Sequence, residues 1–376
     1  MFYLIYRQLL YEPFKTLFTA LAIGAVISLM LVLDGFQQGL YQQLRNTVFD
    51  RGADLILSQA GVSNMIAAHS TIPQLVRLDV EAINGVKNAW PLTSLSVIYE
   101  QDGRKNPVYI FVYDKKGGPL ALSRGHFING PRQIIIDRTL AKLYKLSPGD
   151  PFIVSDFKFK VAGIAKNSAA FFTPIAFISF DDLIDFYMDS DIAADITTFP
   201  LLSYLLVQLE PDANRDSVAR AIEEKVPEVD VFTPKALARN DVQLGRELFG
   251  PILNLLRSIG YIIGLLAVGI VMFTTAHARK RSLAVMRALG FSAGKVATSV
   301  TLETVFLILI AFPAGIIIAQ GIADAIHWIS PVYLVLPTEP GTLLRTLFAC
   351  AVLSLLGALI AVSIITKIEP GIAFRS

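Results

Sequence analysis

Apolar residues gather in four long runs along this chain of 376 residues. Each run approaches the ~20 consecutive apolar residues that an α-helix needs to cross a bilayer. The pattern predicts a first transmembrane helix at 17–34, followed by a large domain of mixed polarity at 35–250. Three further transmembrane helices are expected at 251–276, 300–323 and 343–366. The predicted fold class is therefore an α-helical integral membrane protein of four spans, with a domain inserted between the first and the second.

The inserted domain shows the short, alternating patterns of strands together with amphipathic helices. The stretch 133–166 reads as strand, short helix, tight turn at 148–150, strand, turn and strand. Strands and helices in this irregular order predict an α+β domain. Further elements are expected as a helix at 37–48, strands at 54–58, 95–99, 107–112, 202–208 and 229–232, a helix at 214–226, and a helix from Pro234 back to the bilayer.

The distribution of Lys and Arg predicts the orientation of the spans. Basic residues crowd the segment 277–299 and recur in the tail 367–376, whereas the loop 324–342 has none. Because cytoplasmic loops carry an excess of Lys and Arg, we expect both termini inside and the domain outside. For residues 1–16, two interpretations stay open: an interfacial helix on the inner leaflet, or an ordinary leader to the first span.

The basic segment 277–299 is patterned as a helix, a glycine stop and a new helix. Gly290 stands where an amphipathic helix would end in a left-handed residue, and Ser292 can cap the helix that follows. One interpretation is a loop that only sets topology, and the other is a docking surface for a cytoplasmic partner. The candidate docking residues are Arg281, Leu283, Met286, Arg287, Ala288, Leu289, Gly290 and Phe291.

Small residues repeat every fourth position in two of the predicted spans. Ala20, Gly24 and Ser28 form such a series in the first span, and Gly260 and Gly264 form a pair in the second. A small-xxx-small face allows two helices to approach closely. The alternative is that small residues are simply frequent in membrane helices, and the sequence does not decide between these interpretations.

Composition places the chain among membrane proteins and excludes several activities. It is 53% hydrophobic and 17% charged, with a mean hydropathy of +0.55. A net charge of +2 gives no indication of nucleic-acid binding. The sequence contains no phosphate-binding G-x-x-x-x-G-K-[ST] loop, no catalytic constellation and no His or Cys spacing typical of a metal site. We therefore expect a non-enzymatic chain without a cofactor of its own, so that ATP and Mg, where used, are bound by another polypeptide.

One carboxylate, Glu303, lies at the inner edge of the third predicted span. Ionisable residues inside a membrane are functional candidates by default. Glu303 could equally lie at headgroup depth and pair with a nearby Lys or Arg.

Three local motifs resemble one family. The stretch 281–296, RSLAVMRALGFSAGKV, resembles the E-I-G-x-L-R-A-L-G signature of ABC-transporter permeases of the FtsX and MacB type, with Ser282 where the family usually has Glu. The strand with Phe159, Val161, Gly163 and Ile164 is similar to the closing strand of the MacB-type extracytoplasmic core domain. The tail resembles the ending of that family at Pro370, Ala373, Phe374 and Arg375.

The resemblance implies a function for the whole chain. Such proteins are permease subunits that work as a homodimer, or with a homologous permease, and with two copies of a separate ABC ATPase. Closure of the ATPases pushes the basic segment, and the spans move the outer domain, a mechanism called mechanotransmission. In this family Glu303 matches a common Glu, which implies a structural link between the basic segment and the third span.

The resemblance also implies a setting and a cargo. The expected location is the bacterial inner membrane, and the expected cargo is a hydrophobic one such as lipid, lipoprotein, peptide or drug. A periplasmic adaptor and an outer-membrane channel are possible further partners. The alternative is an FtsX-type signalling subunit that activates a cell-wall hydrolase outside the cell. A secondary transporter is disfavoured, because the chain shows four spans and no inverted repeat.

Overall fold

A computed structural model describes most of the chain, in two compact units. Contacts within the chain group Met1–Gly39, Gly250–Ile329 and Leu334–Ser376 into a helical unit, and Leu40–Phe249 with Ser330–Tyr333 into an α+β unit. The residues that the structure describes are 13–66, 69–101, 103–154, 156–166, 173–189, 201–278, 285–286 and 289–366. The expected interfacial segment 1–16 lies mostly outside these ranges.

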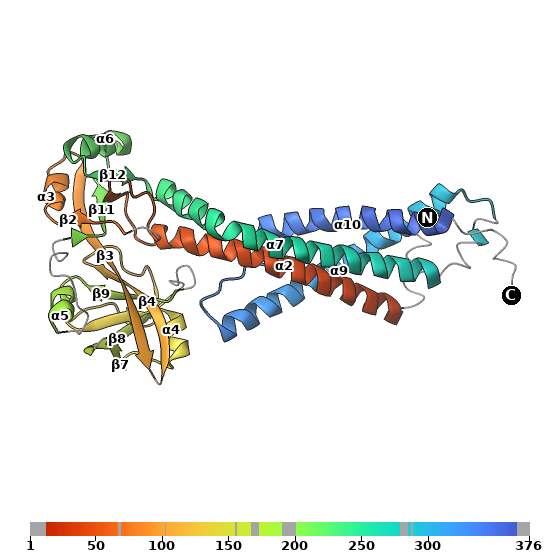
Figure 1. Cartoon of the computed structure of the whole chain (residues 1–376), viewed down its shortest axis with the longest axis horizontal. Helices are drawn as coiled ribbons and strands as arrows, with labels where there is room; N and C mark the ends of the chain where they lie inside the picture. The colour runs from red at the N-terminus through yellow and green to blue at the C-terminus, as the bar shows by residue number, and fades with distance from the viewer. Residues whose placement is uncertain are drawn as a thin grey trace. The chain divides into compact units, whose positions relative to one another are not determined.

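Four long helices follow the four apolar runs (Figure 1). They are α2 (Pro13–Phe49), α7 (Pro234–Ala278), α9 (Ala293–Ile329) and α10 (Pro340–Thr366). Helix α2 joins the first run to the polar helix expected at 37–48, and α7 starts at Pro234 as predicted. Pro13, Pro234 and Pro340 each stand at the first helical position, where the missing N–H of proline costs nothing.

Three of these helices are long and apolar enough to cross a membrane, as judged by length and composition over the described residues. They contain Thr16–Phe49, Pro234–Val271 and Gly294–Ile329. In α10 the shorter apolar stretch Pro340–Val352 was found over the same residues. A fourth span at 343–366 therefore stays a prediction.

The loop predicted at 324–342 is shorter in the structure. Helix α9 continues to Ile329 and α10 already begins at Pro340. One polar contact supports the helix across the predicted boundary at residue 323. The Gln320 side chain donates to the Asp324 carboxylate at 3.1 Å, an i,i+4 pair.

The α+β unit is built on a mixed sheet of ten strands. Their order is β12-β1-β11-β3-β4-β9-β6-β8-β5, with β7 paired to β8, and a separate pair joins β2 to β10. Only β4–β9 and β6–β8 among these pairs are parallel. The strands are β1 (Leu55–Gln59), β2 (Ile72–Pro73), β3 (Val86–Gln101), β4 (Arg104–Tyr113), β5 (Leu122–Gly125), β6 (Gln133–Ile136), β7 (Pro151–Val154), β8 (Phe157–Ala165), β9 (Ile175–Ser179), β10 (Leu201–Leu202), β11 (Tyr204–Leu209) and β12 (Val229–Phe232).

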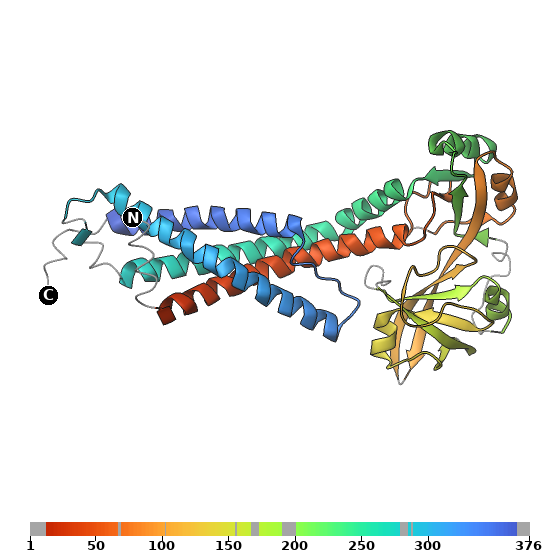
Figure 2. The same ribbon diagram turned by 180° about the vertical axis from the view of Figure 1, so that it is seen from behind.

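Short helices cover the two ends of this sheet, as Figures 1 and 2 show. Helices α3 (Val76–Glu81) and α6 (Arg215–Lys225) pack near β3 and β12, around a core with Leu55 and Ile222. Helices α4 (Arg138–Leu143) and α5 (Asp182–Asp189) pack near β8 and β9, around a second core rich in Phe.

The long strand β3 connects the two ends. Its first part, to Leu92, pairs with β11, and its second part pairs with β4. The sequence predicted only 95–99 as strand, because the preceding residues include Pro91, which strand patterns avoid. Pairing with β11 extends the strand through them. The order predicted for 133–166 is confirmed by β6, α4, β7 and β8.

Two glycines of α2 make room for the loop between α9 and α10. A Cβ on Gly35 would lie 2.7 Å from the Pro337 nitrogen, and a Cβ on Gly39 would overlap the Leu334 carbonyl. The Leu336 amide also donates to the Gly35 carbonyl oxygen at 3.0 Å. The loop therefore packs directly against the α2 backbone within the helical unit.

We predict that Gly39→Ala destabilises the protein although alanine favours helices by about 1 kcal/mol over glycine. The overlap with Leu334 should cost about 1–3 kcal/mol as an overpacked contact. Gly321→Ala in α9 is the matched control, since a Cβ there meets no atom within 4 Å. Thermal unfolding of the purified protein in detergent measures both. Equal stability of the two variants would contradict the packing shown here.

Candidate functional site

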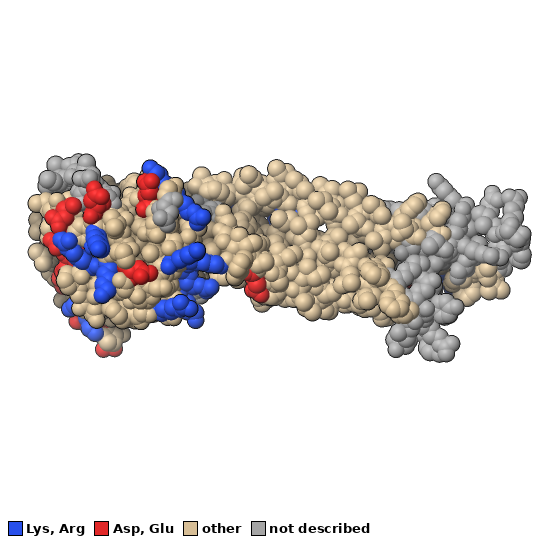
Figure 3. Space-filling model, turned by 90° about the horizontal axis from the view of Figure 1, so that it is seen from below, with Lys and Arg blue, Asp and Glu red and all other residues tan. Residues whose placement is uncertain are grey.

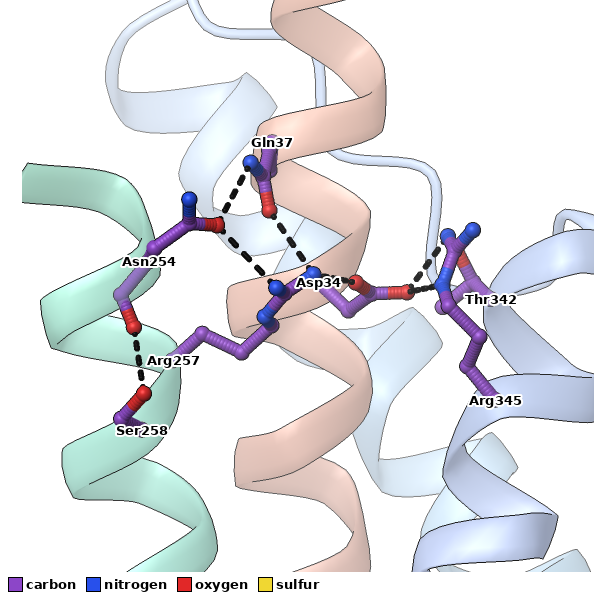
Figure 4. Close-up of polar contacts among 7 residues, drawn as sticks. All are labelled: Asp34, Gln37, Asn254, Arg257, Ser258, Thr342 and Arg345. Atoms are coloured by element: carbon purple, nitrogen blue, oxygen red, sulfur yellow. Dashed lines mark hydrogen bonds and ion pairs between the residues drawn. The ribbon is translucent and has the colours of Figure 1, made fainter. Parts of the chain in front are cut away.

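Three charged residues from three different helices meet inside the helical unit (Figure 4). Asp34 of α2 accepts from the Arg345 guanidinium of α10 at 2.8 and 3.0 Å, both at Oδ2. Its other oxygen, Oδ1, lies 3.5 Å from Nη1 of Arg257 in α7. The three residues form an ion triad that ties α2, α7 and α10 together.

The triad is asymmetric in burial and charge. The Asp34 side chain is fully buried, whereas those of Arg257 and Arg345 are 30% and 43% exposed. One carboxylate and two guanidiniums give the triad a net charge of +1. A buried ion is costly to desolvate, so its stability depends on good geometry and on further hydrogen bonds.

Neutral side chains next to the triad supply those further bonds. Gln37 Oε1 accepts from Arg257 Nη1 at 3.3 Å, and Asn254 Oδ1 accepts from Arg257 Nη2 at 3.0 Å. The Gln37 amide also donates to Asn254 at 3.3 Å, which closes a ring of contacts between α2 and α7. On the side of α10, Thr342 Oγ1 lies 3.5 Å from Arg345 Nη2.

Close helix packing brings the charges within reach. A Cβ on Gly260 would lie 2.6 Å from Leu33 Cδ1, so α7 approaches α2 closely one turn from Arg257. The neighbouring helices α2 and α9 meet at Gly24 and Gly315. A Cβ on Gly24 would lie 3.2 Å from the Ala311 carbonyl oxygen, and one on Gly315 would lie 3.0 Å from the Gly24 oxygen.

The other residues that the sequence analysis selected for helix packing are buried. Ala20 and Ser28 are 4% and 3% exposed in α2, and Gly264 is buried in α7. Glu303 is 7% exposed in α9. Within the described residues, no three His, Cys, Asp or Glu side chains are grouped so as to hold a metal ion.

The described part of the basic segment contains the expected glycine stop. Gly290 has φ +88°, and the Phe291 amide donates to the Met286 carbonyl at 3.1 Å, the long bond of a Schellman motif. The Leu289 and Phe291 side chains are 74% and 42% exposed. Ser292 precedes α9 at its N-cap, with its hydroxyl 3.4 Å from the Lys295 amide. Arg281, Leu283, Arg287 and Ala288 lie outside the described residues.

Within the α+β unit, the end of α2 contacts the sheet and the first part of α7 contacts a loop. Arg51, just after α2, is 2% exposed, donates to the Gly117 carbonyl and lies 4.6 Å from the centre of the Phe111 ring. Burial lowers the pKa of this guanidinium to about 10, which leaves it charged at neutral pH. In α7, the buried Asp241 carboxylate accepts from the Met65 amide at 2.9 Å.

Sequence reasoning missed Asp34, Arg257 and Arg345. A usable signal was present, because each is a charged residue at the edge of, or inside, a predicted apolar run. The predicted topology also places all three at the same end of their spans. What the sequence did not show is which charges meet, since the runs are separated by many residues and by the inserted domain.

Comparison with known protein families identifies the class of protein to which this chain belongs. Residues 16–225 match the model of the MacB-like periplasmic core domain, and residues 255–370 match that of the FtsX-like permease C-terminal region. A core domain inserted after the first apolar helix and a permease region after it define a membrane permease. The chain belongs to the MacB-like periplasmic core domain family and is an ABC transporter permease of the FtsX and MacB type.

Individual relatives are distant but extend over the whole chain. The uncharacterized ABC transporter permease Rv0072 of Mycobacterium tuberculosis strain H37Rv is 22% identical over 370 residues, 98% of this chain and 97% of the relative. The uncharacterized permease Mb2592 of Mycobacterium bovis is 21% identical over the same coverage.

Two solved structures are similar to part of the chain. The extracellular domain of YknZ, a noncanonic ABC-type transporter from Gram-positive bacteria, is 14% identical with a TM-score of 0.36, and covers 48% of this chain and 100% of that domain. The periplasmic region of MacB from Actinobacillus actinomycetemcomitans is 12% identical with a TM-score of 0.37, and covers 51% of this chain and 94% of that region.

We predict that Arg345→Met destabilises the protein by about 3 kcal/mol, because it leaves the buried Asp34 carboxylate with one long contact. Adding Asp34→Asn should restore part of the loss, since the second change removes the uncompensated charge. Arg257→Met is the comparison variant and should be milder, because its carboxylate contact is 3.5 Å. Unfolding in detergent of the wild type, Arg345→Met, Asp34→Asn and the double variant gives the coupling, and Arg257→Met is measured beside them. Strictly additive effects of Arg345→Met and Asp34→Asn would contradict the triad.

Proposed function

We propose that this chain is the mechanotransmitting permease subunit of an ABC complex. Two copies of a separate ATPase bind and hydrolyse ATP, and the long helices convert that event into movement of the outer domain. The Asp34–Arg257–Arg345 triad carries this proposal, because it ties three helices so that a displacement of one displaces the others. Buried charges that are paired in one arrangement resist sliding of the helices past each other.

Two further observations support the proposal. Helices α2 and α7 run without interruption for 37 and 45 residues, from apolar runs into the residues attached by Arg51 and Asp241. A continuous helix is a fairly rigid element. At the other end of α7 the basic segment offers the exposed Leu289 and Phe291 to a partner, beside the Gly290 stop.

The remaining parts of the complex follow from the same proposal. The permease works as a dimer, with itself or with a homologous permease, in the bacterial inner membrane and with both termini inside. The cargo is hydrophobic and is handled outside the membrane, where an adaptor and an outer-membrane channel could receive it. Few charges line the described spans away from the triad, which favours this route over a polar pore.

The docking role of the basic segment is tested by Leu289→Asp and Gly290→Val. The first removes an exposed apolar anchor, for which a loss of about 2 kcal/mol or about 30-fold in ATPase affinity is expected. The second places a β-branched residue at φ +88°, which redirects the following helix. Pull-down of the native ATPase, and its stimulation by the permease, are the measurements.

Gly294→Val is the matched control, since Gly294 is four residues away, is exposed and has no positive φ. Asp150→Ala in the outer domain is a second control. If Leu289→Asp and Gly290→Val both retained full ATPase binding and stimulation, the basic segment would only set topology.

Topology is a separate prediction. A reporter fused at Ser123 should be external, and reporters at Ser292 and Ser376 should be cytoplasmic, because basic segments are retained inside. Accessibility to a membrane-impermeant label measures all three. An external Ser292 would remove the basis for ATPase contact.

A further inference from the structure

A groove of about 510 Å³ lies in the α+β unit between the end of α2 and the start of α7. Figure 3 shows one face of the molecule, on which Lys and Arg side chains of this unit gather. On α7 the lining residues recur at helical spacing, so that they share one face of the helix. The groove is lined by Arg45, Phe49, Lys235, Ala238, Arg239, Val242, Gln243 and Arg246.

The four cations of this groove have no acidic partner among the described residues. Arg45 uses one donor, Nε, on the Tyr41 carbonyl at 3.3 Å, and Arg246 lies 5.3 Å from the centre of the Tyr41 ring. Three other cations of the same unit are paired with carboxylates, as Arg132 is with Asp189 at 2.7 Å. Most of the guanidinium donors in the groove therefore remain available.

Without a bound anion, the positions of these cations are electrostatically unfavourable. Lys235 and Arg239 are four residues apart on α7, and like charges at this spacing repel. Lys235 lies in the first turn of a helix of 45 residues that has no acidic residue there. Since the N-terminus of a helix carries partial positive charge, it favours an anion and not a lysine. A bound anion would relieve both conflicts.

The rest of the lining is apolar except for Gln243, whose side chain donates to the Glu247 carboxylate at 3.1 Å. Phe49 is 43% exposed, and Ala238 and Val242 are nearly buried. A volume of a few hundred Å³ with an apolar wall and convergent polar groups is typical of small-ligand sites. Arginine forks match the oxygens of a phosphate, and charge-assisted bonds of this kind are short and strong.

We propose that this groove binds the phosphate group of an anionic molecule, one that carries no positive charge to balance the phosphate. The group belongs either to the headgroup of an anionic lipid or to a soluble phosphate compound. Arg239 and Arg246 hold the phosphate from α7, Arg45 holds it from α2, and Phe49 contacts its apolar substituent. Such a site is independent of ATPase docking.

The test uses the full-length permease in nanodiscs, without the ATPase. Discs of phosphatidylcholine are compared with discs that also contain phosphatidylglycerol, and inorganic phosphate is added to the former. Hydrogen exchange over 41–49 and 235–246 and native mass spectrometry of retained lipid report binding. We expect protection and retention of phosphatidylglycerol, or protection by inorganic phosphate, and the arm that responds identifies the source.

The variant Arg239→Gln with Arg246→Gln should weaken binding about tenfold or more, because two charge-assisted contacts are lost. Both side chains are exposed, so the fold does not depend on them. Arg215→Gln with Arg220→Gln, on α6, changes the net charge equally and leaves the groove intact. No response in either arm, or an equal loss in both double variants, would overturn the proposal and leave a solvated basic face.

Discussion

The carboxylate of Asp34 has no exposed surface, so the helical unit can pack only in ways that give it a positive partner. Arg345 meets this requirement at 2.8 Å, and Arg257 contributes from the opposite side. Because the two arginines come from α10 and α7, one carboxylate fixes the relative position of three helices. Apolar packing alone would leave the helices freer to rotate and slide, since one apolar stripe resembles another. The charge therefore selects one arrangement among several of similar apolar burial.

The same constraint explains why small residues matter beside the triad. Guanidinium and carboxylate meet at hydrogen-bond distance only when the helix backbones approach closely. Gly260 lies where α7 approaches α2, and Gly24 with Gly315 lie where α2 packs against α9, which carries none of the three charges. The loop between α9 and α10 lies on α2 at Gly35 and Gly39. Backbone contacts and the ion triad thus act together to order the helical unit of this permease.

The contacts that hold the ends of α2 and α7 in the α+β unit differ in kind from the ion triad. In the α+β unit, Arg51 is buried among aromatic rings and backbone carbonyls, and Asp241 accepts from a loop amide. Both ionisable groups are buried and hydrogen-bonded to neutral backbone groups, and burial raises the pKa of Asp241 to about 7 and lowers that of Arg51 to about 10. The groove between the two helix ends differs, because its four cations have no carboxylate partner in the part of the chain that the structure describes.

The sequence by itself determined the long helices, the inserted α+β domain and most of its elements, because hydrophobic periodicity and turn residues are local signals. It predicted the order of 133–166, the exact strand β12 and the left-handed Gly290. The length of β3 and the end of α9 depended on pairing and packing, and were predicted too short. Which charges meet was decided only by tertiary structure. Asp34 precedes Arg257 by 223 residues and Arg345 by 311, and a single sequence has no local pattern that records their contact.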